Sequence, residues 1–217
     1  MGRLLLTAGA LAAALLGLWY LFFFYYNRRK GGAALRWAQN ACAGKASLDE
    51  PRWLDSSCLQ ARLHFASGWF ENARLSLRLL PRPLPIQWVV SRWRRQKETL
   101  TFEADLDCPP GFKLEVLNHR WCANSRRGSA PDEREWTLLR PEPVILTTRN
   151  QWEQELTPVL NALMAARQKS FLRVRFRPES PQLSATVALD ALADARSAAS
   201  FLTLLRELAA GASTHQQ

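Results

Sequence analysis

The sequence has few of the residues that reactive sites need. It contains only three histidines, His64, His119 and His215, and four cysteines among 217 residues. It also lacks the H-E-x-x-H, Walker, G-x-G-x-x-G and G-x-S-x-G motifs of metalloprotease, nucleotide and serine-hydrolase sites. Cys108, His119 and Cys122 fit no zinc spacing, because ten residues separate the first two and no second C-x-x-C pair exists. We therefore expect a protein without a metal, a cofactor or a catalytic activity.

The cysteines are too few, and too poorly placed, for a disulfide framework. Cys108 precedes a Pro-Pro-Gly turn that separates two alternating stretches, 100–107 and 112–121. We interpret these stretches as the two strands of a hairpin, which places Cys108 at its tip and Cys122 near its open end. The two thiols would then lie roughly 30 Å apart at about 3.3 Å per residue, too far for a disulfide.

Long apolar runs are also scarce, and the one that stands out is Leu4–Tyr26, which carries no charge. As a helix it would be about 34 Å long at 1.5 Å per residue, enough to cross a hydrocarbon core of about 30 Å. Amphipathic rings cluster at its C-terminal end, as they do at membrane interfaces, and basic residues follow. The residues predicted to form or flank this membrane anchor are Leu4, Trp19, Tyr20, Tyr25, Tyr26, Arg28, Arg29 and Lys30. A cleaved signal peptide is the less favoured alternative, because the run is long and no A-x-A-like site closes it.

Positive charge is concentrated after the predicted anchor, whereas only Arg3 and the amino terminus precede it. The positive-inside rule therefore predicts a single-pass protein with its C-terminal domain in the cytoplasm. Free thiols would agree with a reducing compartment, although the sequence leaves a Cys42–Cys58 disulfide open.

Acidic residues are under-represented: 29 Lys and Arg face 19 Asp and Glu, giving a net charge of +10. Such a charge suits an anionic partner, and beside a membrane the simplest is the lipid headgroup layer. We expect membrane lipids and a protein of a membrane complex as partners, with nucleic acid the least favoured. The abundant tryptophans are more simply explained by core packing than by a ligand surface.

The middle of the chain predicts strands interrupted by one basic segment. Gly31-Gly32 predicts a hinge, 33–43 a short helix and 45–57 a loop, and the alternation over 59–65 and 70–80 predicts a hairpin. In 86–97, apolar residues at helical spacing are followed by basic ones.

The 86–97 segment has three interpretations. A solvated basic crossover packed on the sheet is the commonest origin of such a pattern, an amphipathic helix in the headgroup layer is the second, and nucleic-acid contact is the third. The candidate residues for contact with an anionic surface are Arg92, Trp93, Arg94, Arg95 and Lys97.

The last third of the chain predicts alternating helices and strands. A mostly polar loop, 123–135, comes first, then a strand at 143–147 and a helix from Asn150 to about Gln168. Strands at 171–176 and 183–189 and a helix over 190–210 that Gly211 ends complete the order.

Together these patterns predict an α+β fold: an N-terminal transmembrane helix and one domain with a mainly antiparallel sheet and two C-terminal-half helices on one face. The predicted organisation is an anchor at 1–30, a linker with a short helix at 31–57, the α+β domain at 58–211 and a polar tail at 212–217. The function we expect is a non-catalytic, single-pass membrane protein that binds protein partners, for instance an accessory or scaffold subunit. The alternative is a module that binds or handles anionic lipids at the membrane surface.

Overall fold

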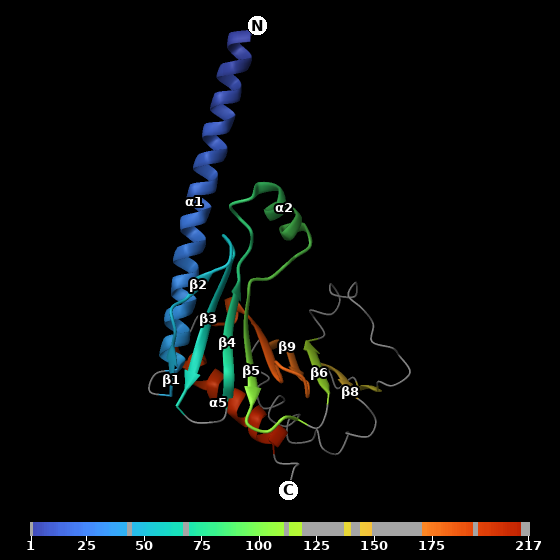
Figure 1. The fold of residues 1–217 in the computed structure, drawn as a ribbon. Helices are drawn as coiled ribbons and strands as arrows, with labels where there is room; N and C mark the ends of the chain where they lie inside the picture. Colours follow the sequence, from blue (N-terminus) through green and yellow to red (C-terminus); the bar gives the residue numbers. More distant parts are fainter. Residues whose placement is uncertain are drawn as a thin grey trace.

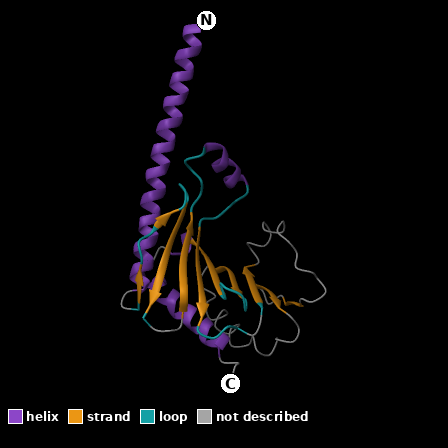
Figure 2. Ribbon diagram, viewed as in Figure 1, coloured by secondary structure: helices purple, strands orange, loops and turns teal. Residues whose placement is uncertain are grey.

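The computed structural model describes residues 2–42, 45–66, 70–110, 113–118, 137–139, 144–148, 171–192 and 195–213. Its helices are α1 (Gly2–Cys42), α2 (Pro85–Trp93) and α5 (Ala195–Ser213), with a short 3-10 turn, η2 (Leu189–Leu192), before α5. The strands are β1 (Ala46–Leu48), β2 (Arg52–Trp53), β3 (Cys58–Phe65), β4 (Phe70–Arg78), β5 (Thr99–Leu106), β6 (Leu114–Asn118), β7 (Thr137–Leu139), β8 (Val144–Thr148), β9 (Phe171–Phe176) and β10 (Leu183–Ala188). The α+β prediction is confirmed: a long apolar helix leads into an antiparallel sheet domain with helices (Figure 2).

Helix α1 is one unbroken helix of 41 residues, and its N-terminal half projects alone beyond the domain (Figure 1). The predicted hinge at Gly31-Gly32 is therefore wrong, and the predicted helix at 33–43 is the end of α1. The reason is tertiary packing. Beyond Gly31, α1 buries Ala34, Ala38 and Ala41 against the domain, and this burial outweighs the cost of about 1 kcal/mol that each glycine adds to a helix.

The strands form an antiparallel sheet in the order β1-β3-β4-β5-β10-β9-β6-β8-β7, with β2 also paired to β3. The predicted β3–β4 hairpin is confirmed. The predicted hairpin around the Pro-Pro-Gly turn is wrong, because β5 pairs with β4 and β10 whereas β6 pairs with β9 and β8. The β9–β10 hairpin lies between them. Alternation had fixed which side chains face the core, but it carries no information about which strands are neighbours.

One face of the sheet is buried under the C-terminal half of α1 and under α5. The largest fully buried side chains of the core between these layers include Phe102, Phe176 and Leu183 from the sheet and Leu205 from α5. The predicted C-terminal helix is confirmed as α5, but it continues through Gly211 to Ser213. Strands β8, β9 and β10 lie where the sequence predicts strands, whereas the predicted loop 45–57 contains β1 and β2. The predicted helix at 150–168 and the polar loop at 123–135 lie outside the described residues.

Candidate functional site

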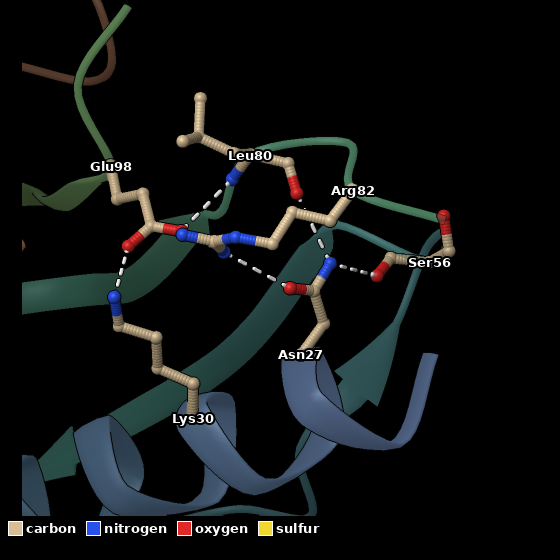
Figure 3. Close-up of polar contacts among 6 residues, drawn as sticks. All are labelled: Asn27, Lys30, Ser56, Leu80, Arg82 and Glu98. Atoms are coloured by element: carbon tan, nitrogen blue, oxygen red, sulfur yellow. Dashed lines mark hydrogen bonds and ion pairs between the residues drawn. The ribbon is translucent and has the colours of Figure 1, made fainter. Parts of the chain in front are cut away.

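The joint between α1 and the sheet domain is built around a buried asparagine. Asn27 follows the apolar run directly, and its side chain is 0% exposed. Its Nδ2 donates to the carbonyl oxygens of Ser56 and Leu80, both at 3.1 Å, and its Oδ1 accepts from Nη1 of Arg82 at 3.2 Å (Figure 3). Every polar group of this amide is satisfied by the domain, so the joint fixes where along α1 the domain sits.

A carboxylate completes the same joint. Glu98 accepts from Nη1 of Arg82 at 2.5 Å, from the backbone N–H of Leu80 at 3.2 Å, and from Nζ of Lys30 (Figure 3). Burial alone would raise the pKa of Glu98, but the hydrogen bonds from Lys30 and Arg82 and from the Leu80 backbone hold this pKa below its usual value. Glu98 is therefore an ionised group shared by α1 and the loop before α2.

Aromatic and cationic contacts extend the joint toward the apolar run. Trp19 donates from Nε1 to the carbonyl of Arg82 at 3.0 Å, and its ring lies 5.8 Å from that of Trp88 on α2. The guanidinium of Arg82 also lies 5.0 Å from the centre of the Tyr26 ring. Part of the predicted aromatic belt thus contacts the domain.

The remaining predicted anchor residues are arranged differently. Arg28 lies 4.2 Å from the centre of the Trp53 ring, and Lys30 belongs to the Glu98 cluster. The exposed members are Leu4, Tyr20, Tyr25 and Arg29. Within the described residues α1 is the one helix long and apolar enough to cross a membrane, and none of its most apolar window is buried in the domain. It is a candidate membrane span.

Helix α2 stands apart from the sheet, beside α1 (Figure 1). It ends at Trp93, earlier than the predicted segment, and Arg95 turns the chain in the left-handed region at φ 50°. The residues predicted to contact an anionic surface, Arg92, Trp93, Arg94, Arg95 and Lys97, come together around this end of the helix, and all are exposed. A hollow of about 430 Å³ lined by Leu80, Arg92, Arg95 and Gln96 lies at the same place.

The second exposed surface is the sheet face opposite α1 and α5. Register places Arg62 on β3 directly opposite Arg74 on β4, and both side chains are exposed. Arg78 lies farther along β4, and Arg52 pairs with Gln60 in the adjacent row. We call the exposed set the arginine face: Arg52, Arg62, Arg74 and Arg78. Farther along the same face charge is balanced internally: Glu103 on β5 lies opposite Arg74, and Glu115 pairs with Arg173 and Arg175.

The described residues hold no group of three or more His, Cys, Asp or Glu side chains suited to a metal ion. Cys42, Cys58 and Cys108 are free thiols, so Cys42 and Cys58 are not bonded to each other. Burial raises the pKa of Cys42 to about 11, which leaves it unreactive at neutral pH. Cys122 and His119 lie outside the described residues, and with the hairpin wrong, the distance argument against a Cys108–Cys122 bond no longer applies.

The sequence interpretation missed Asn27, Arg82 and Glu98, which make the joint. Two signals were present. Asn27 is the first polar residue after the apolar run, and Glu98 is the first acidic residue after Glu71 in a stretch rich in arginine. A single carboxylate among many cationic side chains is expected to form an ion pair, but only the fold shows which cationic side chains it pairs with.

No family model matches the sequence, and no curated protein matches it. Among solved structures, the crystal structure of the mycobacterial trehalose monomycolate transport factor A, TtfA, is similar at a TM-score of 0.42 and 9% identity. The match covers 85% of this chain and 93% of that chain. At this TM-score the likeness carries no weight for fold or function.

Proposed function

We propose that the chain is a non-catalytic, single-pass membrane protein whose α+β domain binds a protein partner, as an accessory or scaffold subunit of a membrane complex. The observation that carries this proposal is the continuity of α1, which runs from the apolar run into the domain core without a break. The Asn27 and Glu98 contacts hold the domain at one position along that helix. A domain fixed in this way presents its surfaces at a set height beside a membrane.

The arginine face is the surface we assign to the partner. Like charges directly opposite each other on neighbouring strands destabilise a sheet, so the Arg62–Arg74 pair costs stability in the isolated chain, and Glu103, opposite Arg74 on β5, offsets part of this cost. An acidic partner surface would remove that cost. It would also contact arginine, which is enriched, with Trp and Tyr, at interface hot spots. The face is a row of exposed side chains on adjacent strands, which suits a protein surface better than a small substrate. The partner we propose is therefore a protein with an acidic patch.

We propose that this domain lies on the cytoplasmic side of the membrane, and the charge distribution around α1 supports this orientation. Arg28, Arg29 and Lys30 follow the apolar run, and Arg3 alone precedes it among charged side chains. The positive-inside rule supports this orientation. A C-terminal tag on the full chain should be cleaved by protease only when the cytoplasmic side of sealed vesicles is exposed.

The proposal is tested by reversing charge on the arginine face of the full chain in its native membrane. A photo-reactive residue at Gln60, within the face, should cross-link to one protein at stoichiometric yield, and the adduct should map to a segment rich in Asp and Glu. Arg62→Glu with Arg74→Glu should abolish the adduct, whereas Arg177→Glu, an equally exposed site outside the face, should leave it intact. Either no adduct at Gln60 or one that survives the double reversal would overturn the proposal.

A second candidate function, binding of anionic lipid, is favoured by a separate observation. Helix α2 turns its apolar side chains outward beside the span rather than onto the sheet, as the exposure of Ile86 and Trp93 shows. This arrangement also argues against the commoner interpretation of the segment as a crossover packed on the sheet.

A further inference from the structure

Helix α2 exposes the side chains that an amphipathic helix usually buries. Ile86 is 82% exposed, Val89 59% and Trp93 85%, and Leu84 and Val90 are exposed beside them. Ser91 is the one buried residue of this helix. An exposed apolar patch of this kind is costly in water and marks a surface that is covered by something else.

The position of α2 along α1 indicates what covers it. Trp88 lies 5.8 Å from the Trp19 ring and 6.4 Å from the Phe23 ring, measured between ring centres. At 1.5 Å per residue, Trp19 and Phe23 lie about 22 and 28 Å along the helix from Leu4. With a span that begins at Leu4, Phe23 lies at the boundary of a hydrocarbon core of about 30 Å and Trp19 about one and a half turns of helix inside it. Helix α2 is therefore held at the depth of the membrane surface.

The charges around α2 have a single sign. No acidic residue occurs between Glu71 and Glu98, and the end of α2 carries Arg92, Arg94, Arg95 and Lys97. Two of these arginines line the hollow beside Leu80. Guanidinium groups bind phosphate oxygens in a forked geometry, and each basic residue near an anionic bilayer contributes about 1 kcal/mol of attraction.

We infer that α2 and the basic residues after it are a second membrane contact, which sits in the interface of a bilayer containing anionic phospholipid. Ile86, Val89 and Trp93 enter the boundary between headgroups and acyl chains, and Arg92 and Arg95 hold lipid phosphates at the hollow. The inference rests on the proposed function, because it requires α1 to span the membrane. The second contact would also orient the domain. A domain anchored by α1 alone can rotate about the axis of α1, whereas a second membrane contact beside α1 fixes the direction in which the arginine face points.

The test uses photo-reactive residues in the full chain, reconstituted into vesicles of phosphatidylcholine with and without phosphatidylglycerol. Probes at Ile86 and Val89 should form lipid adducts, and a probe at His64, exposed on the sheet, should form none. A probe at Leu11, in the middle of the apolar run, reports on the span itself. If Leu11 labels lipid and the α2 probes do not, this inference fails while the anchor stands. If Leu11 fails as well, the proposed membrane span fails, and this inference with it.

The lipid preference is tested by removing the charges. Phosphatidylglycerol should be enriched over its bulk fraction in the Val89 adducts by at least about fivefold, the factor that one basic residue contributes at an anionic surface. Changing Arg92, Arg94, Arg95 and Lys97 to Ser should return the adducts to bulk composition without loss of fold, because all four side chains are exposed. Adducts of bulk composition in the unaltered chain, or a protein adduct at Val89 in native membranes, would overturn the inference.

Discussion

Replacing Glu98 by Gln should weaken the joint between the anchor helix and the domain. The substitution keeps the size of the side chain but removes the charge that Lys30 and Arg82 share. The Glu98 side chain is 9% exposed and that of Arg82 15%, so the pair with Arg82 is shielded from solvent. A hydrogen bond to a charged group in such a place contributes about 1.5–3 kcal/mol. Lys30 is more exposed and adds about 0–1 kcal/mol, so we expect the free energy of unfolding to fall by about 1.5–4 kcal/mol.

The measurement is denaturant unfolding of the full chain in detergent, with tryptophan fluorescence as the readout. Glu179→Gln is the matched control. Glu179 pairs with Lys113 at 2.8 Å on the surface, and its replacement should not change the midpoint measurably. A free energy of unfolding for Glu98→Gln within about 0.5 kcal/mol of the unaltered chain would show that the Glu98 contacts do not stabilise the joint.

Three further predictions follow from the same contacts. Gly32→Ala should stabilise the chain by about 0.5–1 kcal/mol, because the added Cβ meets nothing within 4 Å. Gly31→Ala should be less stable than Gly32→Ala by about 1–3 kcal/mol, because its Cβ would lie 2.7 Å from the indole ring of Trp53. Thermal unfolding of both variants checks this difference. Alkylation at pH 8 followed by mass spectrometry should modify Cys108 well before Cys42, whose pKa is raised to about 11 by burial, and equal rates would contradict the packing of α1. The pKa of Glu98 in the folded chain lies below its ordinary value of 4.5. The ionised carboxylate therefore contributes fully to the free energy of unfolding above pH 4.5, and this contribution is lost as the pH falls further. The stability difference between Glu98→Gln and the unaltered chain should accordingly shrink in acid.

Much of the fold was predictable because local patterns report burial. The apolar run, the alternation in β3, β4, β9 and β10 and the helical spacing in α5 each identify an element from its own residues. Strand order was not predictable in this way. The Pro-Pro-Gly turn suggested that β5 and β6 pair, but a hairpin from the far end of the chain takes the place between them. Such pairing depends on contacts between residues distant in sequence, which periodicity does not contain.

The candidate site was predictable only in its exposed parts. The basic cluster after Trp93 could be found by composition, and the structure leaves it exposed at the end of a helix beside the anchor. The joint could not be found, because Asn27, Arg82 and Glu98 are brought together by the fold alone. The glycine pair illustrates the same limit: Gly-Gly usually predicts flexibility, yet Gly31 lies inside a helix and makes room for the ring of Trp53.

Our proposal is that α1 anchors this chain in the membrane and that the chain is a subunit of a membrane complex. Its most direct test is extraction of the native chain from membranes in a mild detergent, with intact-mass analysis of what elutes together. We expect a chain that retains residues 4–26 and elutes with a protein partner at fixed stoichiometry. A chain that has lost those residues, or that elutes without a protein partner, would contradict it.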